Sequence, residues 1–199
     1  MGYYETGSTL MLITELCTTG CLFSYYHQHD RLKQRKDHLR RVYSVACDMA
    51  KGMMYLHQQD PPIIHRDLKS PNILIDGNWT AKIADFGMSR IQDQTQTMTK
   101  CGSPLWVAPE ILRGERFGLP VDVYSFSIIV WEVLVWSEPY PNLGTKEVLK
   151  GVARENVRNA LPAFAPLSLR KLIEQCWNDK PDLRPTFPEI METLRNLNL

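Results

Sequence analysis

Four polar side chains of complementary chemistry lie near one another in the middle of the sequence. Asp67, Lys69 and Asn72 share one short stretch, and Asp85 follows a little later. Oxygen ligands from Asn72 and Asp85 suit Mg²⁺. Asp67, left free of metal, can accept a proton from an attacking hydroxyl, and Lys69 can neutralise charge on a phosphoryl group in transfer. Each residue alone would be read as a polar loop residue, but the combination predicts a site for a polyphosphate with a divalent metal.

A β-hairpin is predicted to bring these groups together. The segments 73–75 and 80–83 are short and mostly apolar, as expected of strands. Asp76-Gly77-Asn78 between them is typical of a tight turn. Asn72 precedes this hairpin and Asp85 follows it at a similar distance from the turn. We therefore expect both side chains at the same end of the paired strands.

Helices are expected to supply the rest of a mainly α-helical fold, with a strand at residues 10–13. Apolar residues recur at helical spacing between Leu39 and Leu56, with Asp37 as a plausible N-cap. Residues 123–136 are apolar on all sides, but their longest uncharged piece is nine residues, too short to span a membrane. This stretch is predicted to be the buried centre of the domain. Residues 91–100 are polar and aperiodic, so a loop is expected there.

The composition excludes several classes of protein. The formal net charge is +1, from 23 basic and 22 acidic residues, which gives no electrostatic reason to expect nucleic acid or an anionic membrane as a partner. The basic stretch at 31–41 is better explained as a solvated linker and helix start. The five cysteines form no Cys-x-x-Cys pair. This favours a reducing, cytoplasmic setting over a disulfide framework or a zinc site.

Three motifs extend the picture beyond single residues. They are His65-Arg66-Asp67-Leu68-Lys69-Ser70-Pro71-Asn72, Asp85-Phe86-Gly87 and Ala108-Pro109-Glu110. In order and spacing they resemble the catalytic loop, the metal-binding triplet and the end of the activation segment of protein kinases. The resemblance covers nearly the whole chain but only the large C-terminal lobe of the family's fold. It implies a partial kinase domain, with the last small-lobe strand and hinge at 1–20 and the large lobe at 21–199.

The resemblance assigns roles to the central residues. It implies that Asp67 is the catalytic base, that Lys69 contacts the γ-phosphate, and that Asn72 and Asp85 bind the Mg²⁺ of Mg-ATP. It also implies roles for residues that support or regulate the site. Ser103 would hydrogen-bond the base and Lys69, Glu110 would form a buried ion pair with Arg184, Asp122 would cap the catalytic-loop backbone, and Arg66 would pair with a phosphate on Thr95, Thr97 or Thr99.

Residues 10–22 resemble the strand that leads into the hinge of the kinase fold. On this basis Thr14 is the gatekeeper, backbone groups of Glu15 and Cys17 meet the adenine edge, and Leu74 is the floor under the ring. The sequence pattern alone would assign Thr14 and Leu74 to core packing. These assignments therefore rest mostly on the resemblance.

Finer features indicate the type of kinase. Lys69 and the segment Ser103-Pro104-Leu105-Trp106-Val107 resemble serine/threonine kinases, whereas Cys176-Trp177 and Trp131-Glu132 look similar to tyrosine kinases. The mixture is typical of the tyrosine-kinase-like group of serine/threonine kinases, which includes Raf-like and mixed-lineage-like enzymes. The prediction is phosphoryl transfer from Mg-ATP to a protein hydroxyl, with a protein substrate and an upstream activating kinase as partners. A tyrosine or dual-specificity kinase is the alternative within this class.

A second alternative is an inactive binding module or decoy. Upstream of His65 there is no glycine-rich loop and no lysine in an apolar strand, and both are needed to hold the phosphates. We expect the chain to begin inside the domain, to bind nucleotide weakly and to turn over negligibly on its own. The strand at 10–13 should also expose an apolar edge.

Overall fold

The structure is a computed structural model that describes residues 2–7, 9–28, 37–91 and 104–197. In this part of the chain the α-helices outweigh the strands, as predicted. The strands are β1 (Gly2–Thr6), β2 (Thr9–Ile13), β3 (Gly20–Cys21), β4 (Ile63–Ile64), β5 (Ile73–Ile75), β6 (Ala81–Ile83) and β7 (Arg90–Ile91). The helices are α1 (Leu22–Gln28), α2 (His38–His57), α3 (Pro109–Leu112), α4 (Pro120–Val135), α5 (Thr145–Arg154), α6 (Leu167–Cys176) and α7 (Phe187–Arg195). Short 3₁₀ turns are η2 (Ser70–Asn72), η3 (Phe86–Met88), η4 (Pro104–Trp106) and η5 (Pro181–Leu183).

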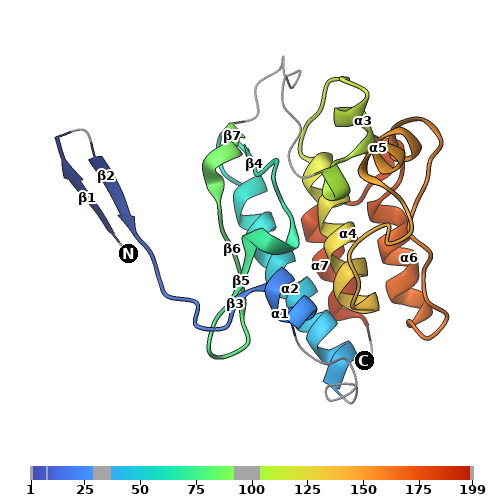
Figure 1. Cartoon of the computed structure of the whole chain (residues 1–199), viewed down its shortest axis with the longest axis horizontal. Helices are drawn as coiled ribbons and strands as arrows, with labels where there is room; N and C mark the ends of the chain where they lie inside the picture. The colour runs from blue at the N-terminus through green and yellow to red at the C-terminus, as the bar shows by residue number, and fades with distance from the viewer. Residues whose placement is uncertain (1, 8, 29–36, 92–103, 198–199) are drawn as a thin grey trace.

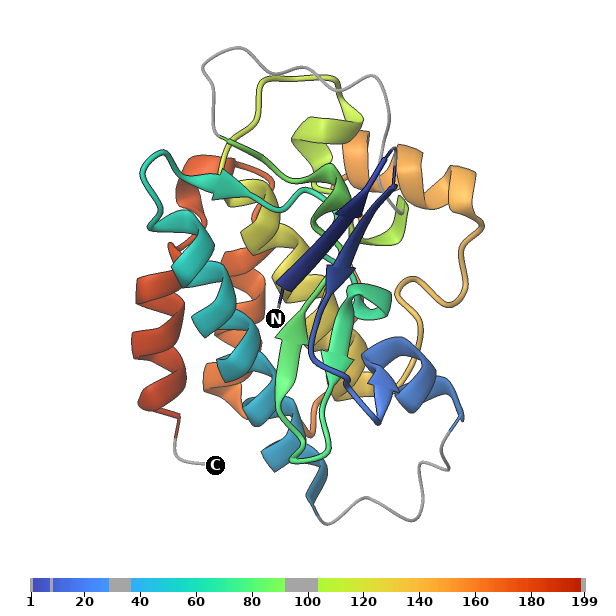
Figure 2. The same ribbon diagram turned by 90° about the vertical axis from the view of Figure 1, so that its left-hand side faces the viewer.

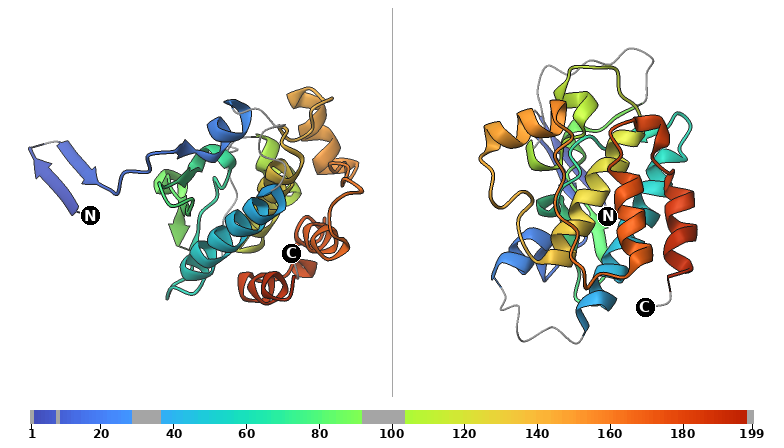
Figure 3. Two further views of the ribbon diagram at one scale, coloured as in Figure 1. Left: turned by 90° about the horizontal axis from the view of Figure 1, so that it is seen from below. Right: turned by 90° about the vertical axis from the view of Figure 1, so that its right-hand side faces the viewer.

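Helix α4 forms the centre of the helical body. It packs against α2 on one side and α6 on another, and α7 covers α2. Figure 3 shows α4 in yellow, with the red helices α6 and α7 beside it. Every residue of α4 from Val121 to Leu134 is buried, which confirms the predicted apolar centre. Within the described residues, no helix combines the length and the apolar character that a membrane crossing requires.

The strands form small antiparallel sheets. β5 and β6 pair as the predicted hairpin, with Ile73 opposite Ile83, and β3 adds to the outer edge of β5. Helix α2 packs behind β6, and Gly52 allows the close approach, since a Cβ there would lie 2.7 Å from Cδ1 of Ile83. The hairpin is therefore fixed to the helical body (Figure 2).

β1 and β2 form a separate hairpin. Figure 1 shows it projecting from the rest of the molecule, joined through the segment that leads to β3. β2 confirms the strand predicted at residues 10–13, and β1 was not predicted. Both faces are open, because the paired side chains of Tyr3 and Leu12 on one face are 70% and 74% exposed, and those of Tyr4 and Met11 on the other are 53% and 48% exposed.

One local prediction was wrong, and another was confirmed only in part. The β5–β6 connection is a loop of residues 76–80, longer than the tight turn predicted at Asp76-Gly77-Asn78. Its positive φ of 64° falls on Trp79, and the Asp76 carboxylate accepts the backbone N–H groups of Asn78 and Thr80. Asp37 occupies the N-cap position of α2, but its side chain makes no capping hydrogen bond. The loop expected at residues 91–100 lies outside the described residues except for Ile91, which ends strand β7 and pairs with β4.

Candidate active site

Three of the four predicted site residues form one hydrogen-bonded cluster. Nζ of Lys69 lies 2.7 Å from Oδ2 of Asp67. The Asn72 amide donates to the backbone oxygen of Asp67 at 2.9 Å and to its Oδ2 at 3.1 Å. Asp67 and Asn72 are buried. The loop between β4 and η2 thus holds a carboxylate whose position is set by an ammonium and an amide.

Asp85 lies on the adjoining strand end but is exposed and belongs to a local turn. The hairpin brings the two segments together, because the backbone N–H of Ala84 donates to the carbonyl of Asn72 at 2.9 Å. Asp85 has a φ of 63°, and its Oδ1 accepts the N–H of Gly87 at 3.3 Å. The predicted juxtaposition of Asn72 and Asp85 is thus present at the backbone level.

The donor set at this end of the hairpin suits Mg²⁺. Asn72 offers an amide oxygen and Asp85 a carboxylate, and Mg²⁺ is usually held by one or two such groups together with substrate phosphates. No group of three or more His, Cys, Asp or Glu side chains within the described ranges could hold a metal ion. The residues therefore fit a metal that arrives with its phosphates better than a metal caged by protein alone.

A cleft opens beside this cluster, between the β5–β6 hairpin and the segment after β2. Its volume is about 560 Å³, within the usual range for small-molecule sites. It gathers the predicted adenine contacts with the predicted metal ligand Asp85 and with Phe86 and Gly87. The lining residues are Leu12, Thr14, Glu15, Cys17, Leu74, Lys82, Ile83, Ala84, Asp85, Phe86 and Gly87.

The residues predicted to contact adenine are less buried than core residues would be. Thr14 is exposed and Leu74 is half-buried, so core packing, which the pattern alone would suggest for both, is wrong for Thr14 and incomplete for Leu74. Burial and the nearby Glu15 carboxylate raise the pKa of the Cys17 thiol. Cys17 is thus held in its neutral thiol form at the mouth of the cleft.

Sequence reasoning missed Lys82, which also lines the cleft. Its Nζ lies 2.9 Å from Oε2 of Glu15, and this hydrogen bond raises the Lys82 pKa. The pair connects β6 to the segment after β2. The one sequence signal for Lys82 was its position in the strand. Side chains alternate between the two faces of a strand, so a residue next to a buried one faces the opposite surface.

Asp122 holds the catalytic-loop backbone, as the resemblance implied. It is 1% exposed and lies in the first turn of α4. Its two oxygens accept the N–H groups of His65 at 2.8 Å and Arg66 at 2.9 Å, and the His57 ring donates at 2.9 Å. Arg66 has a φ of 72°, so this carboxylate stabilises a strained turn.

The expected ion pair between Glu110 and Arg184 is also present. The guanidinium makes two parallel hydrogen bonds to the carboxylate, at 2.7 and 2.8 Å, and both side chains are almost fully buried. Such fork-to-fork pairs are directional and strong. This pair fixes α3 against the loop that contains η5.

The remaining predicted residues divide into two groups. The first group lies in the described part of the chain and makes ring contacts. His65 is buried, and its ring lies 5.3 Å from that of Phe86, which is 49% exposed. The Arg66 guanidinium lies 5.7 Å from the ring of Phe117. The others cannot be placed, because Thr95, Thr97, Thr99 and Ser103 lie outside the described residues.

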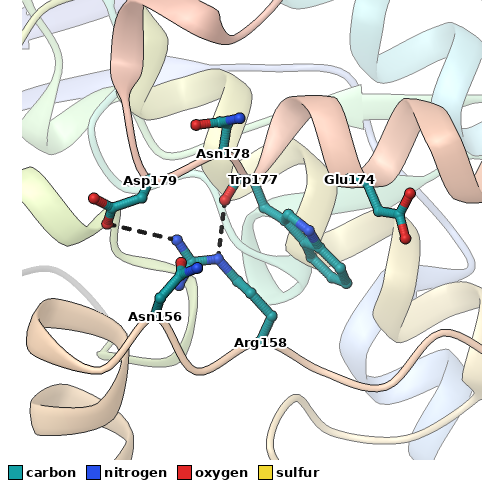
Figure 4. Close-up of a pocket in the computed structure, with 6 residues that line it drawn as sticks. All are labelled: Asn156, Arg158, Glu174, Trp177, Asn178 and Asp179. Carbon is teal, nitrogen blue, oxygen red and sulfur yellow. Dashed lines mark hydrogen bonds and ion pairs between the residues drawn. The ribbon is translucent and has the colours of Figure 1, made fainter.

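A second hollow, of about 200 Å³, lies between the end of α6 and the segment after α5 (Figure 4). Its central cation, Arg158, is committed to the protein itself. The guanidinium donates to the backbone oxygen of Trp177 at 2.9 Å and lies 3.9 Å from Asp179. None of the predicted site residues lines this hollow, so the cleft beside the β5–β6 hairpin is the candidate active site.

Comparisons with known proteins agree with this site. The family model for protein tyrosine and serine/threonine kinases matches residues 1–194. The chain is 40% identical over 188 residues to the probable serine/threonine-protein kinase drkB of Dictyostelium discoideum, covering 94% of this chain and 27% of that protein. It is 40% identical over 199 residues to the serine/threonine-protein kinase CTR1 of Arabidopsis thaliana, covering 99% of this chain and 24% of that protein.

The serine/threonine-protein kinase STY17 of Arabidopsis thaliana is 37% identical over 198 residues, which are 99% of this chain and 34% of that protein. The chain thus spans roughly a quarter to a third of the length of these relatives. Matches of this extent, together with the motifs in the cleft, show that the chain belongs to the protein tyrosine and serine/threonine kinase family.

Proposed function

We propose that the chain carries the phosphoryl-transfer site of an ATP-dependent protein serine/threonine kinase. In this proposal residues 1–20 are the last small-lobe strand and hinge, and residues 21–199 are the large lobe. One observation carries it: a single cleft is lined by the predicted adenine contacts and by Asp85, next to the Asp67–Lys69–Asn72 cluster. The names of the relatives support the serine/threonine class.

The geometry supports a division of labour among these residues. Asp67 is buried and oriented, so its carboxylate can orient a protein hydroxyl and accept its proton. Lys69 can move from Asp67 toward a phosphoryl group and neutralise its charge. Asn72 and Asp85 would hold Mg²⁺, which would supply positive charge to offset that of the phosphates. Thr14, Glu15, Cys17 and Leu74 would hold the base.

Nucleotide binding is the first test of the proposal. Titration of the chain with Mg-ADP in a calorimeter should show weak, saturable binding. Asp85→Asn should weaken it because a neutral amide replaces a charged metal ligand, whereas Asp67→Asn should leave it within about threefold. Asp182→Asn is a matched control, since it makes the same chemical change at an exposed residue outside the cleft. Equal binding by the wild type and Asp85→Asn would contradict the metal assignment.

Phosphoryl transfer is the second test. The chain should transfer radiolabelled γ-phosphate to a generic protein substrate only slowly, and Asp67→Asn should lower that residual rate by about 10²–10⁴-fold, the usual contribution of a general base. Asp182→Asn should retain the wild-type rate. Saturable binding with a rate that Asp67→Asn does not change would instead favour the binding-module alternative.

A further inference from the structure

A buried carboxylate outside the predicted site accepts hydrogen bonds from the catalytic loop and from η4. Glu132 lies in the C-terminal half of α4 and is 1% exposed. Its Oε1 accepts the hydroxyl of Ser70 at 2.7 Å, and its Oε2 accepts the indole N–H of Trp106 at 3.0 Å. Ser70 and Trp106 are themselves buried.

Core packing alone does not account for this residue. Its neighbours Val130, Trp131, Val133 and Leu134 are all buried and apolar, and an apolar side chain would fit such surroundings without the cost of desolvating a charge. Buried charges are weak contributors to stability, and replacing them by apolar residues is often neutral or stabilising. The position of Glu132 therefore points to a requirement for directed hydrogen bonds.

The two hydrogen bonds connect the catalytic loop with η4. Ser70 directly follows Lys69, whose ammonium contacts Asp67 at 2.7 Å. Trp106 ends η4, and its backbone oxygen accepts the hydroxyl of Ser125, two helical turns before Glu132 on α4. One carboxylate thus sets the distance between the segment that carries Lys69 and the segment that leads to α3.

Asp122, Ser125 and Glu132 lie on one side of α4, since intervals of three and seven residues return to nearly the same face of a helix. Each bonds to the catalytic loop or to η4: Asp122 to the backbone at 65–66, Ser125 to Trp106, and Glu132 to Ser70 and Trp106. This polar stripe on a largely apolar helix connects α4 to both segments along its length.

We propose that Glu132 is a positioning residue for phosphoryl transfer, acting through Ser70 on the placement of Lys69 and Asp67 relative to η4. This inference rests on the proposed kinase function. It predicts that Ser70 and Trp106 are coupled through Glu132, and that loss of the carboxylate lowers kcat while the KM for nucleotide stays nearly constant.

The coupling can be measured without enzymatic activity. The chain has five tryptophans, so its indole ¹H–¹⁵N signals are few, and Trp106→Phe identifies the Trp106 signal. Ser70→Ala should shift that signal, because the carboxylate loses one donor and bonds more strongly to the other. Ser127→Ala is the matched control, since Ser127 is a buried serine of α4 that donates to the Tyr124 carbonyl instead. An unchanged Trp106 signal in Ser70→Ala would overturn the proposal.

The catalytic consequence needs a second variant. Glu132→Gln keeps the side-chain shape but can accept only one of the two hydrogen bonds, so kcat should fall by about 10²-fold, the effect of a misplacement of about 1 Å. In Glu132→Met the Trp106 signal should no longer respond to Ser70→Ala. A folded Glu132→Gln protein with the wild-type kcat would refute the positioning role.

The two proposals fail in different ways. Coupling between Ser70 and Trp106 in a wild-type chain that never transfers phosphate would leave the Glu132 connection intact and overturn the kinase function. Phosphate transfer that depends on Asp67 but not on Glu132 would support the kinase function and overturn the positioning role of Glu132.

Discussion

The β1–β2 hairpin and helix α4 bury their side chains to opposite extents. In the hairpin, Tyr3 and Leu12 are 70% and 74% exposed, whereas every residue of α4 between its first and last is buried. The hairpin contributes Leu12 to the lining of the cleft, whereas α4 acts on the neighbouring loop at residues 65–72 through buried hydrogen bonds. The side of the cleft with the proposed adenine contacts depends on a segment that follows an exposed hairpin.

This difference shows how the site is constrained. Asp122 holds the catalytic-loop backbone with hydrogen bonds of 2.8 and 2.9 Å that are excluded from water. On the adenine side, the Lys82–Glu15 pair is partly solvated, with side chains 34% and 51% exposed. Exposed pairs of this kind contribute little to stability, because water screens their charges. The loop that carries Asp67 is therefore held by buried hydrogen bonds to the helical body, whereas the Glu15 side of the cleft is held by a pair that water can reach.

Breaking the buried Glu110–Arg184 pair should have the largest effect on stability. Arg184→Met leaves the Glu110 carboxylate buried without its partner, so the free energy of unfolding in urea should fall by about 3–5 kcal/mol. The exposed Arg154 offers a control, and Arg154→Met should change this quantity by less than about 0.5 kcal/mol. Similar losses in the two variants would remove the distinction between the buried body and its surface.

Substitution of Asp76 in the β5–β6 loop should have an intermediate effect on folding stability, and this effect should depend on pH. The N–H of Thr80, then that of Asn78 and the charge of Lys82, hold the Asp76 pKa below its ordinary value of 3.8. A carboxyl with a lowered folded-state pKa stabilises the fold above its unfolded pKa, and this contribution is lost as pH falls through the folded pKa. The stability advantage of the wild type over Asp76→Ala should therefore shrink below pH 3.8.

Asp76→Asn sharpens this test, because it keeps an oxygen acceptor for the loop but does not titrate. In thermal unfolding followed from pH 6 to pH 2, wild type should lose more stability than Asp76→Asn in the acid range. Identical acid sensitivity of the two proteins would exclude Asp76 as the cause.

The smallest effect is expected in the β1–β2 hairpin. Tyr3→Ser should change the free energy of unfolding by less than about 0.5 kcal/mol, because the side chain is already solvated. It should also reduce self-association in light scattering, since exposed apolar patches promote association. Ile128→Ala, in the centre of α4, is the contrasting variant and should lose about 2–5 kcal/mol. A large loss in Tyr3→Ser would show that the hairpin is packed in solution.

The sequence predicted the parts of the site that are close together along the chain. Asp67, Lys69 and Asn72 fall within one loop, and apolar strands around a turn sufficed to bring Asp85 to the same end. The turn itself was wrong, because two Asp76 hydrogen bonds and the left-handed Trp79 replaced the expected Asp-Gly geometry. A short turn motif could not reveal the length of the connection.

Long-range polar partners could not be predicted in the same way. Lys82 and Glu15 are 67 residues apart, and Ser70 and Glu132 are 62 residues apart. Judged by residue type alone, these four would be ordinary surface residues. Only the packing of β6 and of α4 brings the members of each pair together. A signal was nevertheless present for Glu132, since a charge inside an apolar helix implies buried hydrogen-bond donors.

The backbone of the cleft has a further consequence for how this chain can change. Arg66 and Asp85 both have positive φ, at 72° and 63°, where a residue other than glycine costs about 1–3 kcal/mol. Glycine would relieve that cost at either position, yet it would remove the Asp85 carboxylate from the lining of the cleft or the Arg66 guanidinium from its place over Phe117. Selection for thermal robustness and selection for a working site therefore oppose each other at these two positions.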